Sequence, residues 1–148
     1  MATPAKDRSD VRVMSEIAII AQLSNARLDR SLPAGLSAPQ FGVLTHFMRR
    51  GGTESPARLA KAFQVTKGAM TNTLQRLEAQ GYVTVIADEA DGRRKLVSLT
   101  SAGARAFDAG VAAVRPHLEG LRSAFTEAEF QAALPFLTAL RAWLDDER

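Results

Sequence analysis

The order of elements between residues 55 and 103 constrains the fold more than any other feature of this sequence. "SPARLAKAF" predicts a short helix with Pro56 in its first turn, and "QVT" after it predicts a tight turn. Residues 67–80 predict a second helix, which Gly81 ends. "YVTVI" and "KLVSL" are rich in β-branched residues and predict two strands, joined by a charged loop. Two short helices and a β-hairpin therefore lie at the centre of the chain.

Longer helices are expected on both sides of this central part. Before it, apolar residues recur at helical spacing through residues 10–30, and a capping box of Ser37 and Gln40 opens a second helix that ends near Arg50. After it, one helix begins at Thr100, and "TEAE" is a capping box that opens the last helix. The helix that follows Ser37 is expected to bury four side chains: Phe41, Leu44, Phe47 and Met48.

The helix predicted at residues 67–80 is polar on all sides but one. Met70, Leu74 and Leu77 are spaced four and then three residues apart, so they bury a single stripe. A helix with a polar outer face can enter the major groove of DNA, where base edges display distinct donor and acceptor patterns. The outer face offers these residues: Lys67, Gly68, Ala69, Thr71, Asn72, Gln75 and Arg76.

The types of these residues suggest individual contacts. Asn72 and Gln75 can pair with adenine edges, although each is equally typical of an ordinary exposed helix. Gly68 costs about 1 kcal/mol of helix propensity, and it can remain because it lets one backbone approach another closely. Arg58 and Lys61 lie on the preceding helix and are expected to contact phosphates rather than bases.

The charged and hydroxyl side chains of the same face have more than one possible partner. Lys67 and Arg76 can reach phosphates or guanine, and Thr71 can contact a thymine methyl group or a phosphate. From residue 58 to residue 95 there are seven basic and four acidic residues, which favours a basic working face.

The loop "ADEADGRR" between the two strands is acidic at its start and basic at its end. Next to a helix in the major groove, this loop would lie over the minor groove, whose concentrated negative potential favours arginine. Arg93 is the expected minor-groove contact, and Arg94 and Lys95 are weaker ones. Asp91 is expected to hold the Arg93 guanidinium by a charge-assisted hydrogen bond, and Asp88 either acts similarly or is only solvated.

Three stretches resemble the MarR family of bacterial transcriptional regulators: "APQFGVLTHF", "ARLAKAFQVTKGAMTNTLQRLEAQGYV" and "DEADGRRKLVSLTSAG". The wing of that family reads roughly D-x-x-D-x-R-x-x-x-V-x-L-T-x-x-G. Seven positions of this chain fall on that pattern in register: Asp88, Asp91, Arg93, Val97, Leu99, Thr100 and Gly103. The family often has proline after the first wing aspartate, where this chain has Glu89.

The resemblance implies a mainly α fold with a small β-hairpin, a winged helix-turn-helix flanked by N- and C-terminal dimerisation helices. Residues 1–9 are expected to be a disordered N-terminus and residues 10–148 a single MarR-like domain. Within that domain, residues 36–103 would be the DNA-binding lobe, and residues 10–35 and 104–148 the dimerisation helices.

The same resemblance implies the function. A homodimer would read a pseudo-palindromic operator in double-stranded DNA, usually to repress transcription, and a small-molecule effector would commonly release it. The alternative is a winged-helix module that binds another protein and reads no DNA. Such a module would carry an apolar outer face on the helix at residues 67–80, whereas that face is polar here.

Other functions are disfavoured by what the sequence lacks. It has no cysteine, which excludes disulfides, thiolate metal sites and a cysteine nucleophile. Its two histidines, His46 and His117, lie far apart, so neither a metal nor a cofactor is expected. Without a Gly-rich phosphate loop or a Ser/His/Asp set, the chain is not expected to be an enzyme. With no apolar run of about 18 residues and no signal peptide, the expected location is the cytoplasm.

Overall fold

The computed structural model describes residues 8–147. Of the predicted disordered N-terminus, residues 1–7 lie outside the described residues, and Ser9 already belongs to the first helix. The chain forms two compact units, one within Met1–Ala113 and the other within Val114–Arg148. The expectation of a single domain over residues 10–148 stays a prediction.

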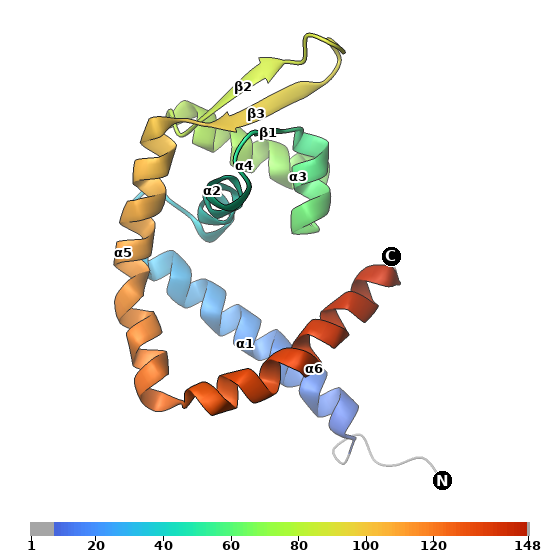
Figure 1. Cartoon of the computed structure of the whole chain (residues 1–148), viewed down its shortest axis with the longest axis vertical. Coiled ribbons are helices and arrows are strands. Elements are labelled where there is room, and N and C mark those ends of the chain that lie inside the picture. Colours follow the sequence, from blue (N-terminus) through green and yellow to red (C-terminus); the bar gives the residue numbers. More distant parts are fainter. Residues whose placement is uncertain (1–7, 148) are drawn as a thin grey trace. The chain divides into compact units, whose positions relative to one another are not determined.

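Six helices and three strands make up the described part of the chain, so the fold is mainly α with a small β element, as predicted (Figure 1). The helices are α1 (Ser9–Ser31), α2 (Ala38–Arg50), α3 (Pro56–Phe63), α4 (Lys67–Ala79), α5 (Ser101–Ala124) and α6 (Glu127–Asp146). The strands are β1 (Thr53–Glu54), β2 (Val83–Ala87) and β3 (Lys95–Leu99).

Both predicted capping boxes are present. At the start of α2, the Ser37 hydroxyl accepts a hydrogen bond from the Gln40 backbone N–H at 3.4 Å, and Gln40 Oε1 accepts one from the Ser37 N–H at 2.8 Å. At the start of α6, Thr126 and Glu129 exchange the same two bonds at 3.2 and 3.1 Å. Each box satisfies two backbone donors that a helix N-terminus leaves without intrahelical partners.

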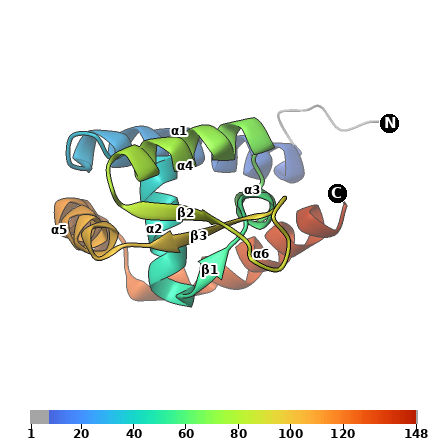
Figure 2. The ribbon, with the colours of Figure 1, turned by 90° about the horizontal axis from the view of Figure 1, so that it is seen from above.

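The sheet has three strands rather than the two of the predicted hairpin. Its order is β1-β3-β2 with antiparallel pairing throughout, and Figure 2 shows β3 between its two neighbours. Val97 of β3 lies opposite Glu54 on one side and Val85 on the other. β1 is only two residues long, too short to show the alternating pattern by which a sequence indicates a strand.

The buried stripe of α4 is confirmed. Met70, Leu74 and Leu77 are 3%, 4% and 0% exposed, and α4 packs against α2, α3 and β2. Val83 of β2 and Val97 of β3 close the same core from the sheet side. Because the apolar stripe of α4 packs in this core, the other side chains of α4 face outward.

The prediction that Met48 of α2 is buried is wrong. Met48 is 42% exposed, whereas Val43, Leu44 and Phe47 are 1%, 0% and 2% exposed. These buried positions follow the three- and four-residue spacing of a helix face, and Met48 is rotated off that face by one residue. Phe41, on the same side of α2 as Met48, stacks on Phe107 of α5 with ring centroids 5.7 Å apart.

The start of α5 is bonded to the end of α4 and the start of β2. The Thr100 hydroxyl caps α5 by accepting from the Gly103 N–H at 3.0 Å, and it donates to the Gly81 carbonyl oxygen at 2.6 Å. The Thr100 N–H donates to the Tyr82 carbonyl oxygen at 3.1 Å. Thr100 therefore fixes the root of the hairpin.

In the second unit, α6 leaves large apolar side chains exposed. Those more than half exposed are Leu134, Phe136 and Trp143, at 52%, 55% and 60%. In the first unit, α1 does the same with Ile20 and Leu23, at 57% and 66%. Among the described residues, no helix has the length and apolar character needed to cross a membrane.

Candidate nucleic-acid interface

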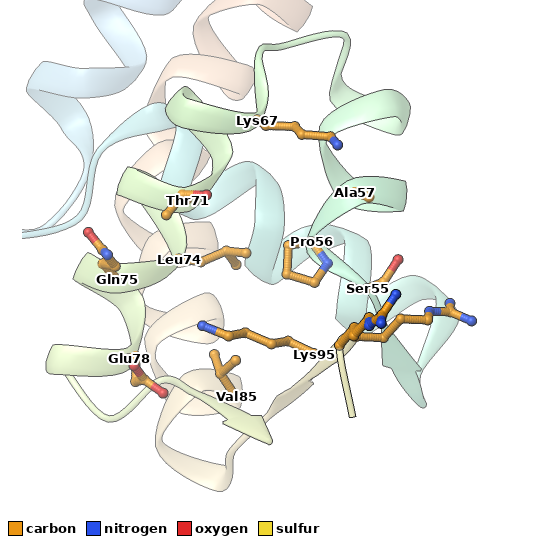
Figure 3. A pocket seen from close by; sticks show the side chains of 12 residues that line it. Ser55, Pro56, Ala57, Lys67, Thr71, Leu74, Gln75, Glu78, Val85 and Lys95 are labelled. Carbon is orange, nitrogen blue, oxygen red and sulfur yellow. The ribbon is translucent and has the colours of Figure 1, made fainter. Parts of the chain in front are cut away.

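A surface hollow of about 420 Å³ lies between α4, the start of α3 and the wing, by which we mean β2, β3 and the loop at residues 88–94. Figure 3 shows side chains from all three parts around it. α4 contributes Lys67, Thr71, Leu74, Gln75 and Glu78. The start of α3 contributes Ser55, Pro56 and Ala57, and the wing contributes Val85, Arg93, Arg94 and Lys95.

The α4 side of the hollow is one line of side chains. Lys67, Thr71 and Gln75 are spaced by four residues, so they stand above one another on a single helix face. Thr66 begins this helix by accepting a hydrogen bond from the Ala69 N–H at 3.1 Å. The cap fixes where the line starts, with Lys67 as the first helical residue.

The charge of the hollow is strongly positive. Lys67 approaches it from α4, and Arg93, Arg94 and Lys95 approach it from the wing. Glu78 is the one acid among the lining residues. The sequence-predicted residues that meet here are Lys67, Thr71, Gln75, Arg93, Arg94 and the weaker candidate Lys95.

The other predicted DNA contacts are exposed but do not line this hollow. They are Arg58, Lys61, Gly68, Ala69, Asn72 and Arg76. Gly68, Asn72 and Gln75 follow one another at spacings of four and three, which makes them the ridge of α4 that points furthest from its buried stripe. A β-carbon on Gly68 would meet only Thr66 Oγ1, at 4.0 Å, so the protein's own packing does not require glycine there.

Arg76 faces a different surface. It lines a second hollow of about 620 Å³, together with Gln80 and residues of the α1–α2 loop. Gln80 crosses to that loop by donating to the Gly35 carbonyl oxygen at 2.5 Å and accepts a bond of 2.8 Å from the buried Gln40. The end of α4 is thus tied to the segment between α1 and α2.

The wing loop is shaped by its two aspartates. Asp88 Oδ1 accepts from the Ala90 N–H at 3.0 Å, and Asp91 Oδ1 accepts from the Arg93 N–H at 3.1 Å. Both bonds run from a side chain to the backbone two residues on, the pattern of an Asx turn. The Asp88 N–H donates to the Arg94 carbonyl oxygen at 2.9 Å and closes the loop.

This geometry corrects the expected contact of Asp91. Its carboxylate bonds the backbone of Arg93, and no ion pair joins it to the Arg93 guanidinium in the described structure. A backbone amide two residues away is the nearer donor, because the Asx turn closes without ordering a long side chain. Asp91 therefore shapes the loop that carries Arg93 and leaves the guanidinium free.

Two polar residues of the hollow were not among the sequence-predicted contacts: Ser55 and Glu78. Lys95, a weaker sequence candidate, shares a strand face with the buried Val97, because residues two apart in a strand point to the same side. Lys95 therefore lies at the edge of the face that packs on the core. Ser55 had no local signal, because its approach to the wing depends on the pairing of β1 with β3.

The described residues contain no group of three or more His, Asp or Glu side chains that could hold a metal ion. The site is instead a helix face, a basic hairpin and the hollow between them. A helix-turn-helix followed by a hairpin, with both directed at one hollow, defines a winged helix-turn-helix protein.

Comparison with known proteins gives the family. A model of the MarR family matches residues 34–94. The multiple antibiotic resistance protein MarR of Escherichia coli K12 is 34% identical over 90 residues, which are 57% of this chain and 62% of that protein. The transcriptional regulator PecS of Dickeya dadantii is 28% identical over 132 residues, 85% of this chain and 78% of PecS. PecS is named as a transcriptional regulator, in agreement with the prediction that the chain is not an enzyme.

A solved structure agrees along most of the chain. A variant of E. coli MarR in complex with operator DNA superimposes with a TM-score of 0.77 and 28% identity, over 88% of this chain and 94% of that one. The chain is similar to the MarR family of winged helix-turn-helix transcriptional regulators, in sequence over residues 34–94 and in fold over most of its length. Its sequence match spans less than two thirds of the length of E. coli MarR.

Proposed function

We propose that this protein is a homodimeric regulator that binds an operator in double-stranded DNA. The observation that carries the proposal is the single hollow lined by both α4 and the wing. When a helix lies in the major groove and a hairpin in the neighbouring minor groove, the sugar–phosphate strand between the grooves passes between them. A hollow with Lys67, Arg93, Arg94 and Lys95 on its walls suits that polyanionic strand.

The proposed contacts divide by type. Gly68, Asn72 and Gln75, on the outer ridge of α4, face base edges in the major groove. Lys67, Arg94 and Lys95 at the hollow, with Arg58 and Lys61 of α3, neutralise phosphates and set the register of the complex. Arg93 reaches into the minor groove from a loop that the two Asx turns hold in shape.

The proposed dimer rests on exposed apolar surface. Leu23 of α1 and Trp143 of α6 are 66% and 60% exposed in a single chain. Burying apolar area contributes roughly 25 cal/mol per Å², so a second copy that covers these helices is strongly favoured. Two copies related by a two-fold axis would present two α4 helices to half-sites about one turn of DNA apart, roughly 34–36 Å.

Regulation is proposed by analogy with the family. The dimer occupies its operator and represses transcription, and a small-molecule effector releases it. An effector acts only through its differential affinity for the DNA-binding and the non-binding arrangement of the dimer. The chemistry of that effector is outside this proposal.

Selection of bound sequences from random duplex DNA tests the proposal. We expect an enriched pseudo-palindrome, bound with an affinity that falls steeply as salt increases. The measurement is fluorescence anisotropy of the selected duplex across a salt series. A chain that binds no duplex even at low salt would contradict the proposal and favour the alternative, a winged-helix module that binds another protein.

Sedimentation of a matched pair of variants tests the dimer. Leu23→Glu places a charge on the exposed apolar face of α1, whereas Gln22→Glu places the same charge one residue away on a polar position. We expect the first to dissociate the dimer and the second to leave it intact. A wild-type chain that sediments as a monomer while bound to its operator would contradict the homodimer.

A further inference from the structure

Three side chains from three elements meet beside the hollow. They are His46 of α2, Glu54 of β1 and Arg58 of α3. Glu54 Oε2 lies 3.8 Å from His46 Nε2, and Glu54 Oε1 lies 3.4 Å from Arg58 Nε. The carboxylate thus stands between an inner imidazole and an outer guanidinium, next to Ser55 of the hollow wall.

The inner side of this arrangement is closed. The His46 side chain is 11% exposed, its Nε2 atom is buried, and that atom has no hydrogen-bond partner among the described residues. Its ring lies against Phe47 edge-on and against Phe63 at a centroid distance of 5.6 Å. A buried polar nitrogen is costly without a partner, and the Glu54 carboxylate is the charged group that faces it.

The outer side is open. The Arg58 side chain is 76% exposed, and its contact with Glu54 uses Nε. A phosphate is commonly bound by two parallel N–H donors of one guanidinium. With Nε nearest to Glu54, the edge of the Arg58 guanidinium formed by its two terminal nitrogens is left for a phosphate.

The backbone around Glu54 is fixed as well. Glu54 pairs with Val97 in the sheet, and the hydroxyl of Ser55 caps α3 by accepting from the Arg58 N–H at 3.3 Å. The backbones of Glu54 and Arg58 are therefore both held in regular secondary structure. Only the long arginine side chain remains to be ordered.

We infer that Glu54 is a positioning residue for DNA binding: it holds the Arg58 guanidinium in the orientation that meets a phosphate. The inference rests on the proposed function. An exposed ion pair of this kind contributes little to stability. Its effect lies in restricting the arginine before DNA arrives, which lowers the ordering cost of association.

The direction in which Glu54→Gln changes DNA affinity distinguishes a positioning role from an effect of charge alone. Glu54→Gln removes a negative charge next to the DNA face, and charge alone would make binding to a polyanion tighter. Positioning predicts the opposite, a dissociation constant about three- to tenfold higher. Glu119→Gln, on an exposed residue of α5, makes the same charge change and is expected to leave affinity unchanged.

A double-mutant cycle with Arg58→Ala completes the test. If Glu54 acts through Arg58, Glu54→Gln no longer weakens binding once Arg58 is alanine. The measurement is anisotropy with the selected duplex, and thermal melting shows whether each variant is folded. If Glu54→Gln unfolds, Glu54→Asp replaces it, because aspartate keeps the charge but shortens the reach, so positioning still predicts weaker binding.

The outcomes distinguish the two proposals. A wild-type chain that binds no duplex overturns the proposed function. A wild-type chain that binds, with a Glu54→Gln variant that binds equally well or more tightly, overturns the positioning role alone. An equal loss with and without Arg58 also overturns it, because the effect would then not pass through the arginine.

Discussion

Gly103 of α5 lies directly against the backbone of Tyr82 at the start of the wing. A β-carbon on Gly103 would collide with the Tyr82 carbonyl oxygen and would lie 2.6 Å from Leu99 Cδ1. The same carbonyl oxygen accepts the Thr100 N–H, so it is not free to move aside. The threonine and glycine of the family's T-x-x-G pattern therefore serve one junction between the hairpin and α5.

Gly103→Ala is expected to destabilise the chain. Overpacking a tight contact typically costs about 1–3 kcal/mol, and here a backbone atom is one of the obstacles. Urea denaturation measures the loss. Gly120→Ala on the same helix is the control: a β-carbon there meets nothing within 4 Å, so it is expected to raise stability by roughly 0.5–1 kcal/mol. Equal effects at the two glycines would contradict the close approach.

Gly68→Ala is expected to separate stability from DNA binding. The added β-carbon is at an ordinary distance from Thr66, so the helix should gain up to about 1 kcal/mol of stability. Operator affinity should fall, because the methyl group stands on the ridge proposed to approach the bases. Thermal melting and anisotropy measure the two effects. An alanine variant that binds DNA as tightly as wild type would show that the backbone does not approach closely.

Arg93→Ala is expected to weaken operator binding by on the order of 1–3 kcal/mol. It should also reduce the slope of log affinity against log salt by about 0.9, since one phosphate-neutralising charge is lost. Arg122→Ala, an exposed arginine of α5, is the matched control for the loss of one positive charge. An unchanged affinity and slope for the Arg93 variant would remove Arg93 from the interface.

Two substitutions of Asp91 test how this residue acts. Asp91→Asn keeps an oxygen that can accept the Arg93 N–H and so should preserve the wing turn. Asp91→Ala removes that oxygen, so the amide of Arg93 should exchange faster and operator binding should weaken. Hydrogen exchange and anisotropy measure the two effects. If asparagine lost as much affinity as alanine, the charge of Asp91 rather than its backbone bond would be what matters.

The helices and their caps were predictable because their signals are local. Ser37 and Thr126 each stand three residues before a Gln or Glu, and Met70, Leu74 and Leu77 mark a single stripe. Such patterns report bonds within one turn of helix, which do not depend on the rest of the molecule. The exposed face of α4 followed from the same stripe.

The features that the sequence did not predict depend on contacts between distant segments. β1 exists because Thr53 and Glu54 pair with a strand more than forty residues later, and nothing in the two residues themselves indicates it. Ser55 reaches the hollow through that pairing. The Asp91 contact was misjudged for a different reason: charge suggested a guanidinium partner, whereas the turn geometry supplied a nearer backbone amide.

The short ladder between β1 and β3 joins the elements on two sides of the hollow. β1 leads directly into α3, and β3 carries the second half of the wing, so a displacement of the wing also displaces the start of α3. If both parts contact DNA as proposed, they move together. An effector of the proposed dimer would then weaken DNA binding by changing the spacing between its two DNA-binding lobes, because moving the wing within one lobe would break the pairing of β1 with β3.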